Sequence, residues 1–360
     1  MAPGRPALAR LRPGWRPATR PWPASGRGWR PASDPTPHVS AAVAARPRAA
    51  ELRDDRNMDQ GRPGAGGVPV NDSVWAVPAP ALRPFIARYV GYRQAGVAPG
   101  THRGLPSPYL TVIFTLDDPL TLAGHPDPRQ PPGNYATLVG GLHTAPALIT
   151  HPGRQSGIQL LMSPLGARAL LGLPAAELAS IDVEGPAVLG PLADHIGERL
   201  RAAEDWPARF AVLDQMLTSR LGAGPAGPAV SSGASAEVSH AWRRLLAAGG
   251  RCAVSGLAAD VGWSDRHLRG RFRDETGLTP KAAARVIRFD RARRLLQRRA
   301  AAATVLPPLA DLAADCGYYD QAHLAREFRD LAGCPPSAWL AEEFRIVQAG
   351  PAVARPGLAT

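Results

Sequence analysis

The stretch that decides the fold is a pattern that occurs twice in the C-terminal part of the chain. The first copy reads LAADVGWSDRHLRGRFRDETGLTP over residues 257–280, and the second reads LAADCGYYDQAHLAREFRDLAGCPP over residues 312–336. Equivalent positions lie 55 residues apart up to the first glycine and 56 residues apart after it, so one residue is inserted in or just after a turn. Surface turns tolerate insertions best. The spacing therefore predicts the same local structure twice.

Each copy carries the signals of a helix, a tight turn and a second helix. A glycine offers the permissive backbone of the turn, and a serine or aspartate is a candidate N-cap for the second helix. A second glycine, followed shortly by proline, ends that helix. These residues are Gly262, Ser264 and Gly277 in the first copy, and Gly317, Asp320 and Gly333 in the second.

The second helix of the first copy has two different faces. Leu268 and Phe272 lie four residues apart and are expected to point inward, whereas Arg266, Arg269 and Arg273 recur on another face. A helix that presents arginines from a helix-turn-helix is suited to enter a major groove and to contact phosphates and guanine edges. A solvated charged face is the alternative. The repeat, the caps and the turn spacing together favour DNA binding.

A long helix is predicted between the two copies, over residues 279–299. Thr279 is its N-cap and Pro280 occupies its first position. About twenty residues form a rod of roughly 30 Å, near the ~34 Å between successive major-groove faces. One chain could therefore place both motifs on one side of DNA. The predicted buried stripe consists of Ala282, Val286, Phe289, Ala292 and Leu296.

The charge of the chain is unevenly distributed. The 360 residues contain 42 Lys+Arg and 30 Asp+Glu, a net charge of +12, but residues 1–57 alone contribute +7. Residues 264–299 hold 12 basic and 4 acidic side chains, whereas residues 309–346 hold 3 basic and 7 acidic ones. We therefore expect the first motif to supply most of the affinity for DNA.

The N-terminal extension, residues 1–67, is predicted to be disordered because it is rich in Arg and Pro and shows no apolar periodicity. It has two interpretations. One is a basic arm that binds nucleic acid. The other, which we favour, is an upstream region that is not part of the protein, with translation starting at Met58.

Residues 68–221 are predicted to form a small antiparallel sheet or barrel followed by a helical subdomain. Strand signals occur at 109–116, 120–122, 136–139 and 157–162, and residues 80–90 favour either a short helix or the start of a strand. Two helices are expected at about 189–203 and 206–221. With the all-α C-terminal part, the fold class is α+β.

This N-terminal domain carries no recognisable catalytic motif, and we predict no catalytic residue, no cofactor and no metal site. Its histidines match no ligand spacing, and no cysteine accompanies them. A ligand pocket beside the sheet could use Arg103, Arg154 or Gln159, but the effector-binding residues are not identified. The histidines are His102, His125, His143 and His151.

The remaining segments complete the predicted domain organisation. Residues 222–237 form a flexible Gly/Ser/Pro linker, residues 238–343 the DNA-binding domain and residues 344–360 a disordered tail. Three cysteines fit a reducing cytoplasm rather than a disulfide framework. No apolar run is long enough for a membrane span, so no membrane association is expected.

Residues 238–343 resemble the DNA-binding domain of the AraC/XylS family of transcriptional regulators. The second copy carries the resemblance most specifically, with Gly317, His323-Leu324, Phe328, Gly333, Pro336 and Trp339. The resemblance implies a double helix-turn-helix with a connecting helix, and a cytoplasmic, nucleoid-associated regulator. Residues 68–221 resemble sensor domains of unknown ligand that accompany this unit in high-GC bacteria.

The resemblance also implies roles for individual residues. Gly270 departs from the larger polar residue expected at its position. The implied base-reading residues are Arg266, Arg269 and Gly270 in the first motif, and Gln321, Ala322, Ala325 and Arg326 in the second. The implied contacts to the DNA backbone are Ser264, Arg273, Lys281, Arg285, Arg288 and Arg329.

The sequence therefore predicts a regulator that binds double-stranded operator DNA and responds to a small-molecule effector. RNA polymerase and a second copy of the chain are further candidate partners. Two alternatives stay open. One is an enzyme domain at 68–221 that the helix-turn-helix unit directs to DNA, and the other is a constitutive architectural DNA-binding protein.

Overall fold

The computed structural model describes residues 70–222, 234–302 and 308–348, the last five without their side chains. The predicted extension at 1–67, most of the linker and most of the tail lie outside the described residues. Helix α4 ends at Gly222, where the predicted linker begins, and helix α5 begins at Ala236, two residues before the predicted start of the DNA-binding domain at 238. The predicted domain boundaries stay a prediction.

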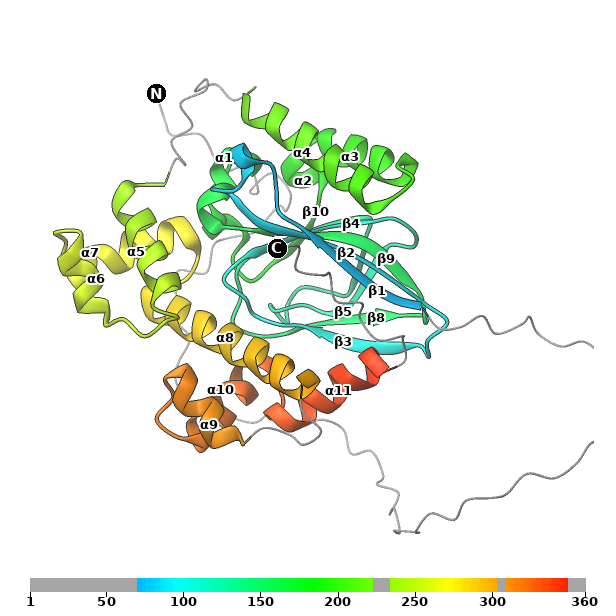
Figure 1. The fold of residues 1–360 in the computed structure, drawn as a ribbon. Coiled ribbons are helices and arrows are strands. Elements are labelled where there is room, and N and C mark those ends of the chain that lie inside the picture. The colour runs from blue at the N-terminus through cyan, green and yellow to red at the C-terminus, as the bar shows by residue number, and fades with distance from the viewer. Residues whose placement is uncertain (1–69, 223–233, 303–307, 349–360) are drawn as a thin grey trace, which may run out of the picture. The chain divides into compact units, whose positions relative to one another are not determined.

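The strands of the N-terminal half of the described chain form two antiparallel sheets (Figure 1). One has six strands in the order β1-β2-β9-β4-β7-β10, and the other has four in the order β3-β8-β5-β6. The strands are β1 Val70–Ala76, β2 Ile86–Ala95, β3 Gly100–Gly104, β4 Leu110–Thr115, β5 Leu120–Gly124, β6 Gly133–Tyr135, β7 Thr137–Gly140, β8 Ala147–His151, β9 Gln155–Met162 and β10 Asp182–Glu184. This confirms the predicted antiparallel β-structure.

The hydrophobic pattern explains the centre of each sheet. In β4, the run LTVIFT is buried at every position except Thr111. Its β-branched and aromatic residues favour a buried strand. Ile113 of β4 packs in one cluster with Leu122 of β5 and Ile149 of β8, which joins the two sheets. Residues 80–90, predicted to form either a short helix or the start of a strand, form both: a 3-10 turn at Pro80–Leu82 and then the first part of β2.

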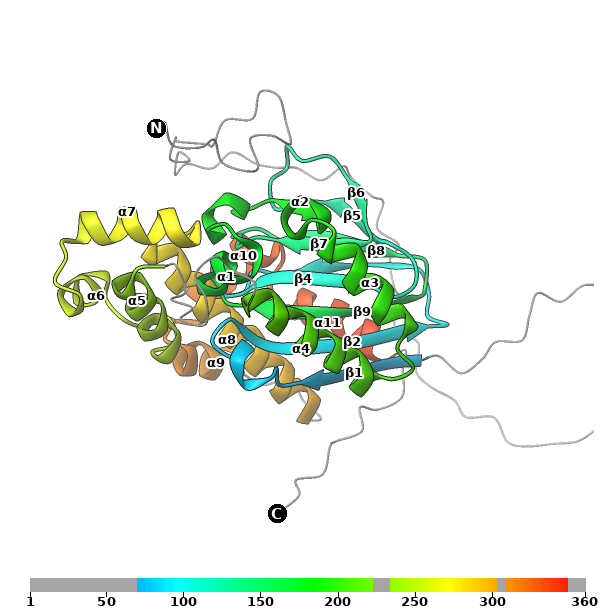
Figure 2. The same ribbon diagram turned by 90° about the horizontal axis from the view of Figure 1, so that it is seen from above.

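Helices cover the outer face of the six-stranded sheet. Figure 2 shows α3 (Leu192–Ala202) and α4 (Trp206–Gly222) lying across β4, β9 and β2, as the predicted helical subdomain requires. The Tyr89 ring of β2 stacks on Phe210 of α4, with 6.0 Å between ring centroids. Gly91 is needed here, because a Cβ atom at that position would lie 2.6 Å from the Trp206 ring. The short helices α1 (Ala167–Leu171) and α2 (Pro186–Leu189) precede them.

The C-terminal half is entirely helical within the described residues, as predicted. The two motifs consist of short helix pairs, and the connecting helix α8 is buried along one side at Val286, Phe289, Ala292 and Leu296. Ala282, predicted in that stripe, is only partly buried. The helices are α5 Ala236–Ala247, α6 Val254–Asp260, α7 Asp265–Thr276, α8 Pro280–Ala302, α9 Leu309–Cys316, α10 Gln321–Ala332 and α11 Pro336–Gln348.

Candidate functional site

The first helix-turn-helix has the local geometry that its sequence predicts. The turn after α6 passes through Gly262 at a φ of 69°, a backbone conformation that favours glycine. The Ser264 side chain then caps α7 by accepting a hydrogen bond from the His267 backbone N–H at 3.3 Å. Gly277 ends the helix in the left-handed conformation, at a φ of 84°.

Helix α7 separates an apolar face from an arginine face. Leu268 and Phe272 are completely buried, and the Phe272 ring packs against Trp242 of α5. Arg266, Arg269 and Arg273 are exposed, and none of them forms an ion pair with another described residue. The guanidinium groups are therefore available to an external partner.

The second helix-turn-helix repeats this construction with less charge. Gly317 turns the chain at a φ of 74°, and Asp320 caps α10 by accepting a hydrogen bond from the His323 backbone N–H at 2.6 Å. Its predicted base-reading positions also lie at the surface, except that Ala325 is half-buried. The exposed ones are Gln321, Ala322 and Arg326.

Two of the predicted phosphate-binding arginines have partners within the domain. Arg285 donates to Glu327 at 2.9 Å and to Asp330 at 3.1 Å, linking α8 to α10. Arg288 lies 5.3 Å from the centroid of the Tyr318 ring. A phosphate contact from either arginine would compete with these interactions. Ser264, Arg273, Lys281 and Arg329 are exposed.

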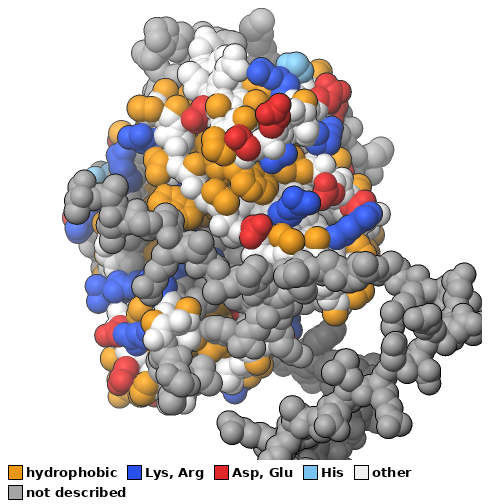
Figure 3. Space-filling model, turned by 45° about the vertical axis from the view of Figure 1, so that its right-hand side comes forward, with side chains coloured by type: hydrophobic (Ala, Val, Ile, Leu, Met, Phe, Trp, Pro, Cys, Tyr) orange, Lys and Arg blue, Asp and Glu red, His pale blue; other side chains and the backbone are white. Residues whose placement is uncertain are grey.

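One face of the molecule lacks the uniform basic charge of a surface that binds the DNA backbone (Figure 3). On the face seen in Figure 3, basic and acidic side chains are interspersed around a central group of hydrophobic ones. That face does not carry a field of one sign, as a surface for binding the DNA backbone would. This leaves the arginine face of α7 as the better candidate.

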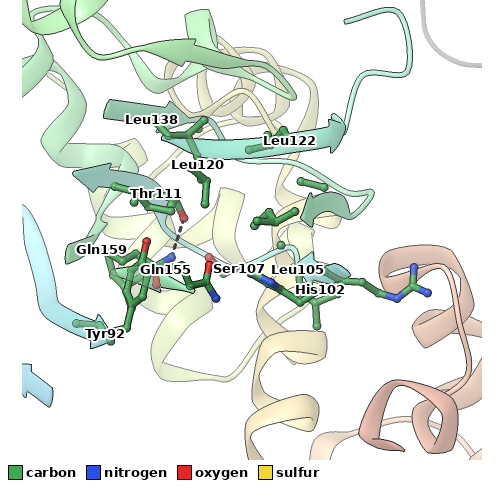
Figure 4. Close-up of a pocket in the computed structure, with 18 of the residues that line it drawn as sticks. Tyr92, His102, Leu105, Ser107, Thr111, Leu120, Leu122, Leu138, Gln155 and Gln159 are labelled. Carbon is green, nitrogen blue, oxygen red and sulfur yellow. Dashed lines mark hydrogen bonds between the residues drawn. The ribbon is translucent and has the colours of Figure 1, made fainter. Parts of the chain in front are cut away.

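A second candidate site is a cavity of about 450 Å³ between the two sheets. Figure 4 shows Leu120, Leu122 and Leu138 on one side of it and polar side chains such as Gln155 and Gln159 on the other. The Gln159 amide donates to the Thr111 hydroxyl at 3.3 Å. Both Arg103 and Gln159, predicted from the sequence, line this cavity. Arg154 does not line it, and instead pairs with Asp118 at the surface.

Histidines contribute to this cavity without forming a metal site. His102 lines it, and burial together with the nearby His151 lowers the His102 pKa to about 4. The buried His125 bonds Asp182 at 2.7 Å and lies 3.2 Å from the Tyr135 hydroxyl, so it has partners on both ring nitrogens. In the described part of the chain, no group of His, Cys, Asp or Glu side chains could hold a metal ion.

The C-terminal helices close one side of the cavity. Arg293, Arg294 and Gln297 of α8 and Trp339 and Glu343 of α11 all line it. These residues are far in sequence from the strands, and no sequence motif marked them as ligand-binding. A molecule in the cavity would therefore touch both the sheets and the DNA-binding half.

Among the described residues, two ion pairs also join the halves. Arg168 of α1 binds the carboxylate of Glu275, at the C-terminal end of α7, through three hydrogen bonds of 2.8–3.0 Å. Arg103 of β3 binds Glu342 of α11 at 2.9 Å. The first helix-turn-helix is thus connected to the N-terminal half through Glu275 of its own second helix. The second is connected through Glu342 of α11, the helix that follows it.

Two family models match the chain. A model described as a helix-turn-helix domain matches residues 257–342, which include both copies of the repeat. A model described as a domain of unknown function, DUF6597, matches residues 76–184. The C-terminal part is a helix-turn-helix domain of the AraC type, which confirms the predicted resemblance. The protein is a DNA-binding transcription regulator.

Solved structures of AraC-type proteins resemble this chain. A probable AraC family transcriptional regulator from Rhodopseudomonas palustris is 28% identical, over 32% of this chain and 100% of its own, with a TM-score of 0.27. ToxT from Vibrio cholerae is 10% identical, over 72% of this chain and 98% of its own, with a TM-score of 0.41. The AraC-like transcriptional activator CuxR is 13% identical, over 65% and 97%, with a TM-score of 0.26.

A search of curated proteins finds no match to the chain. Within the described residues, no helix has the length and apolar character needed to cross a membrane.

Proposed function

We propose that the regulator reads its operator mainly with helix α7. The observation that carries this proposal is the set of exposed arginines Arg266, Arg269 and Arg273, which have no ion-pair partner among the described residues. In the proposal, Arg266 and Arg269 contact base edges, with Gly270 at the groove floor, and Arg273 contacts phosphate. The other phosphate contacts come from Ser264, Lys281 and Arg329.

The second motif has a smaller share in this proposal. Helix α10 contributes Gln321, Ala322, Ala325 and Arg326 to base contacts, and its surroundings are more acidic. Arg285 and Arg288 serve the packing of the domain first, because both have partners inside it. They would contact phosphates only if those partners were released.

In the same proposal, the N-terminal domain is a sensor and not an enzyme. Its effector is a small molecule that occupies the cavity of about 450 Å³ between the sheets. Because α8 and α11 also line this cavity, binding there would alter how the DNA-binding half is held. The regulator would act in the cytoplasm on the nucleoid, as a homodimer and with RNA polymerase as its further partner.

The DNA-reading part of the proposal is tested by measuring affinity for an operator found by selection from random DNA. Arg266→Ala and Arg269→Ala should each weaken binding by about 1–3 kcal/mol and relax base preference at one position. Arg326→Ala should weaken it less. Arg201→Ala, which removes an exposed arginine of α3, is the matched control and should leave the affinity unchanged. Equal losses at Arg326 and Arg269 would contradict the proposal.

A further inference from the structure

One end of the cavity contains more positive charge than its partners neutralise. Arg88 of β2 lines it together with Arg293 and Arg294 of α8. Asp290 accepts a hydrogen bond from Arg293 at 2.6 Å and one from Arg294 at 2.7 Å. Arg88 forms no ion pair with any described residue. Arg293 and Arg294 therefore share the Asp290 carboxylate, and Arg88 has no carboxylate of its own within the described residues.

The three arginines are close enough for their charges to act on one another. The pKa of Arg88 is lowered by burial and by the positive charges of Arg294 and Arg293, an effect that Tyr109 and Asp290 only partly oppose. The Nε atom of Arg293 is buried and has no hydrogen-bond partner. An unpaired buried donor is costly, and so is a cluster of like charges.

The acidic groups of the lining do not remove this excess. Asp182 also lines the cavity, but its carboxylate is bonded to the buried His125. Glu343 accepts a hydrogen bond from Gln297, and burial raises its pKa, which disfavours its charged form; the positive charge of Arg293 opposes this shift only in part. Arg103, a half-buried arginine of the lining, is already paired with Glu342.

We propose that Arg88, Arg293 and Arg294 bind the anionic group of the effector, and that this group is a carboxylate or a phosphate ester. The inference rests on the proposed sensor function of the cavity. The apolar part of the molecule lies against Leu120, Leu122 and Leu138, at the other side of the cavity. Guanidinium forks bind carboxylates and phosphates through paired, charge-assisted hydrogen bonds. Such an anion connects a strand of the sensor to the helix between the two DNA-binding motifs.

The test uses the full chain and three probes that share one apolar body. They are 1-naphthoate, 1-naphthyl phosphate and the neutral 1-naphthamide, with affinity measured by titration calorimetry. At least one anion should bind about tenfold or more tightly than the amide. Preference between the two anions separates a carboxylate from a phosphate-ester effector. Equal affinity for all three probes, or no binding of either anion, would overturn the proposal.

Variants localise the binding. Arg88→Gln and Arg294→Gln should each weaken binding of the preferred anion about tenfold, while Asp290 keeps Arg293 as a partner. The matched control is Arg154→Gln, an exposed arginine outside the cavity, which should change the affinity by less than about threefold. A control effect as large as that of Arg88→Gln would mean that only general charge is sensed, and would overturn the proposal.

A measurement without any probe guards against misfolding of the variants. Because Arg88→Gln relieves repulsion in the empty site, its thermal midpoint should equal that of the wild type or exceed it by roughly 1–3 °C. A fall of the same size would mean that Arg88 supports the fold, and would overturn the proposal.

DNA affinity separates this inference from the function on which it rests. If the full chain binds its operator but neither anion, only the inference fails. If the chain selects no DNA sequence, the proposed function fails whatever the probes do. If Arg294→Gln weakens DNA binding about tenfold and leaves anion binding unchanged, the cluster belongs to the DNA interface and the inference is overturned.

Discussion

At the scale of single residues, the arginines of this protein differ mainly in their partners. Arg269 and Arg285 are both on helices of the DNA-binding half, yet Arg269 is exposed without an ion pair whereas Arg285 holds Glu327 and Asp330. An arginine that is already paired loses those bonds when it binds a phosphate. The same residue type is therefore available to an external partner in one place and used for helix packing in another.

His102 should make the stability of the protein depend on pH. Burial, and then the nearby His151, lower its pKa from 6.5 to about 4, so the folded chain holds it neutral while the unfolded chain protonates it below pH 6.5. The stability that depends on a neutral His102 is fully present above pH 6.5, the pKa of the histidine in the unfolded chain. This stability is lost as the pH falls toward 4. We expect a loss of roughly 1–3 kcal/mol over that range, measured as the free energy of unfolding in urea.

The variant His102→Gln should flatten part of this dependence. Burial also lowers the pKa of His143 and His151, so some slope should remain. His195→Gln, at an exposed site on α3, is the control and should keep the wild-type slope. An unchanged slope in His102→Gln would show that His102 is not the group responsible.

At the scale of elements, the helices of the repeat could be predicted because their signals are local. A capping side chain, a left-handed glycine and the apolar spacing all lie within one helix, and Ser264, Asp320 and Gly333 act as expected. The strands are less predictable from the sequence. The signals for β4 and β9 are runs rich in apolar residues, whereas β1 and β3 are mostly exposed or half-buried. The strands β3 and β8 have five residues each and are held by pairing with each other, although they are far apart in the sequence.

The contact between α1 and α7 is an element-scale feature that can be tested by a double-mutant cycle. Arg168→Ala leaves the largely buried carboxylate of Glu275 without its partner, so it should destabilise the chain by about 1–2 kcal/mol. In the background of Glu275→Gln the same change should cost clearly less. The free energy of unfolding of the four proteins gives the coupling. Strictly additive effects would show that this ion pair does not stabilise the attachment of α7.

At the scale of the whole molecule, α8 determines the spacing of the two motifs. Its 23 residues give a rod of roughly 34 Å, similar to the distance between successive major grooves. One chain should therefore protect two neighbouring major grooves on one face of the DNA. Insertion of about five base pairs between the two half-sites moves one of them to the opposite face, and should weaken binding about tenfold or more.

Hydroxyl-radical footprinting with the unmodified and the extended site measures this effect. Insertion of about ten base pairs returns the two half-sites to the same face of the DNA but leaves them one helical turn too far apart. A single chain with a rigid α8 should therefore not regain its affinity. Full tolerance of the five-base-pair insertion would indicate that the two motifs bind independently. It would also contradict the role of α8 as a spacer.

The sequence by itself determined the repeated motif, its caps and its charged face, because each depends on residues within about twenty positions of one another. It therefore also indicated the DNA-binding function. Only the tertiary structure decided the cavity between the sheets and the surroundings of its arginines. Arg88, Arg293 and Arg294 meet because a strand and a helix some 200 residues apart pack together. The spacing of these arginines along the chain does not predict that contact, because burial and charge pairing are properties of the folded chain alone.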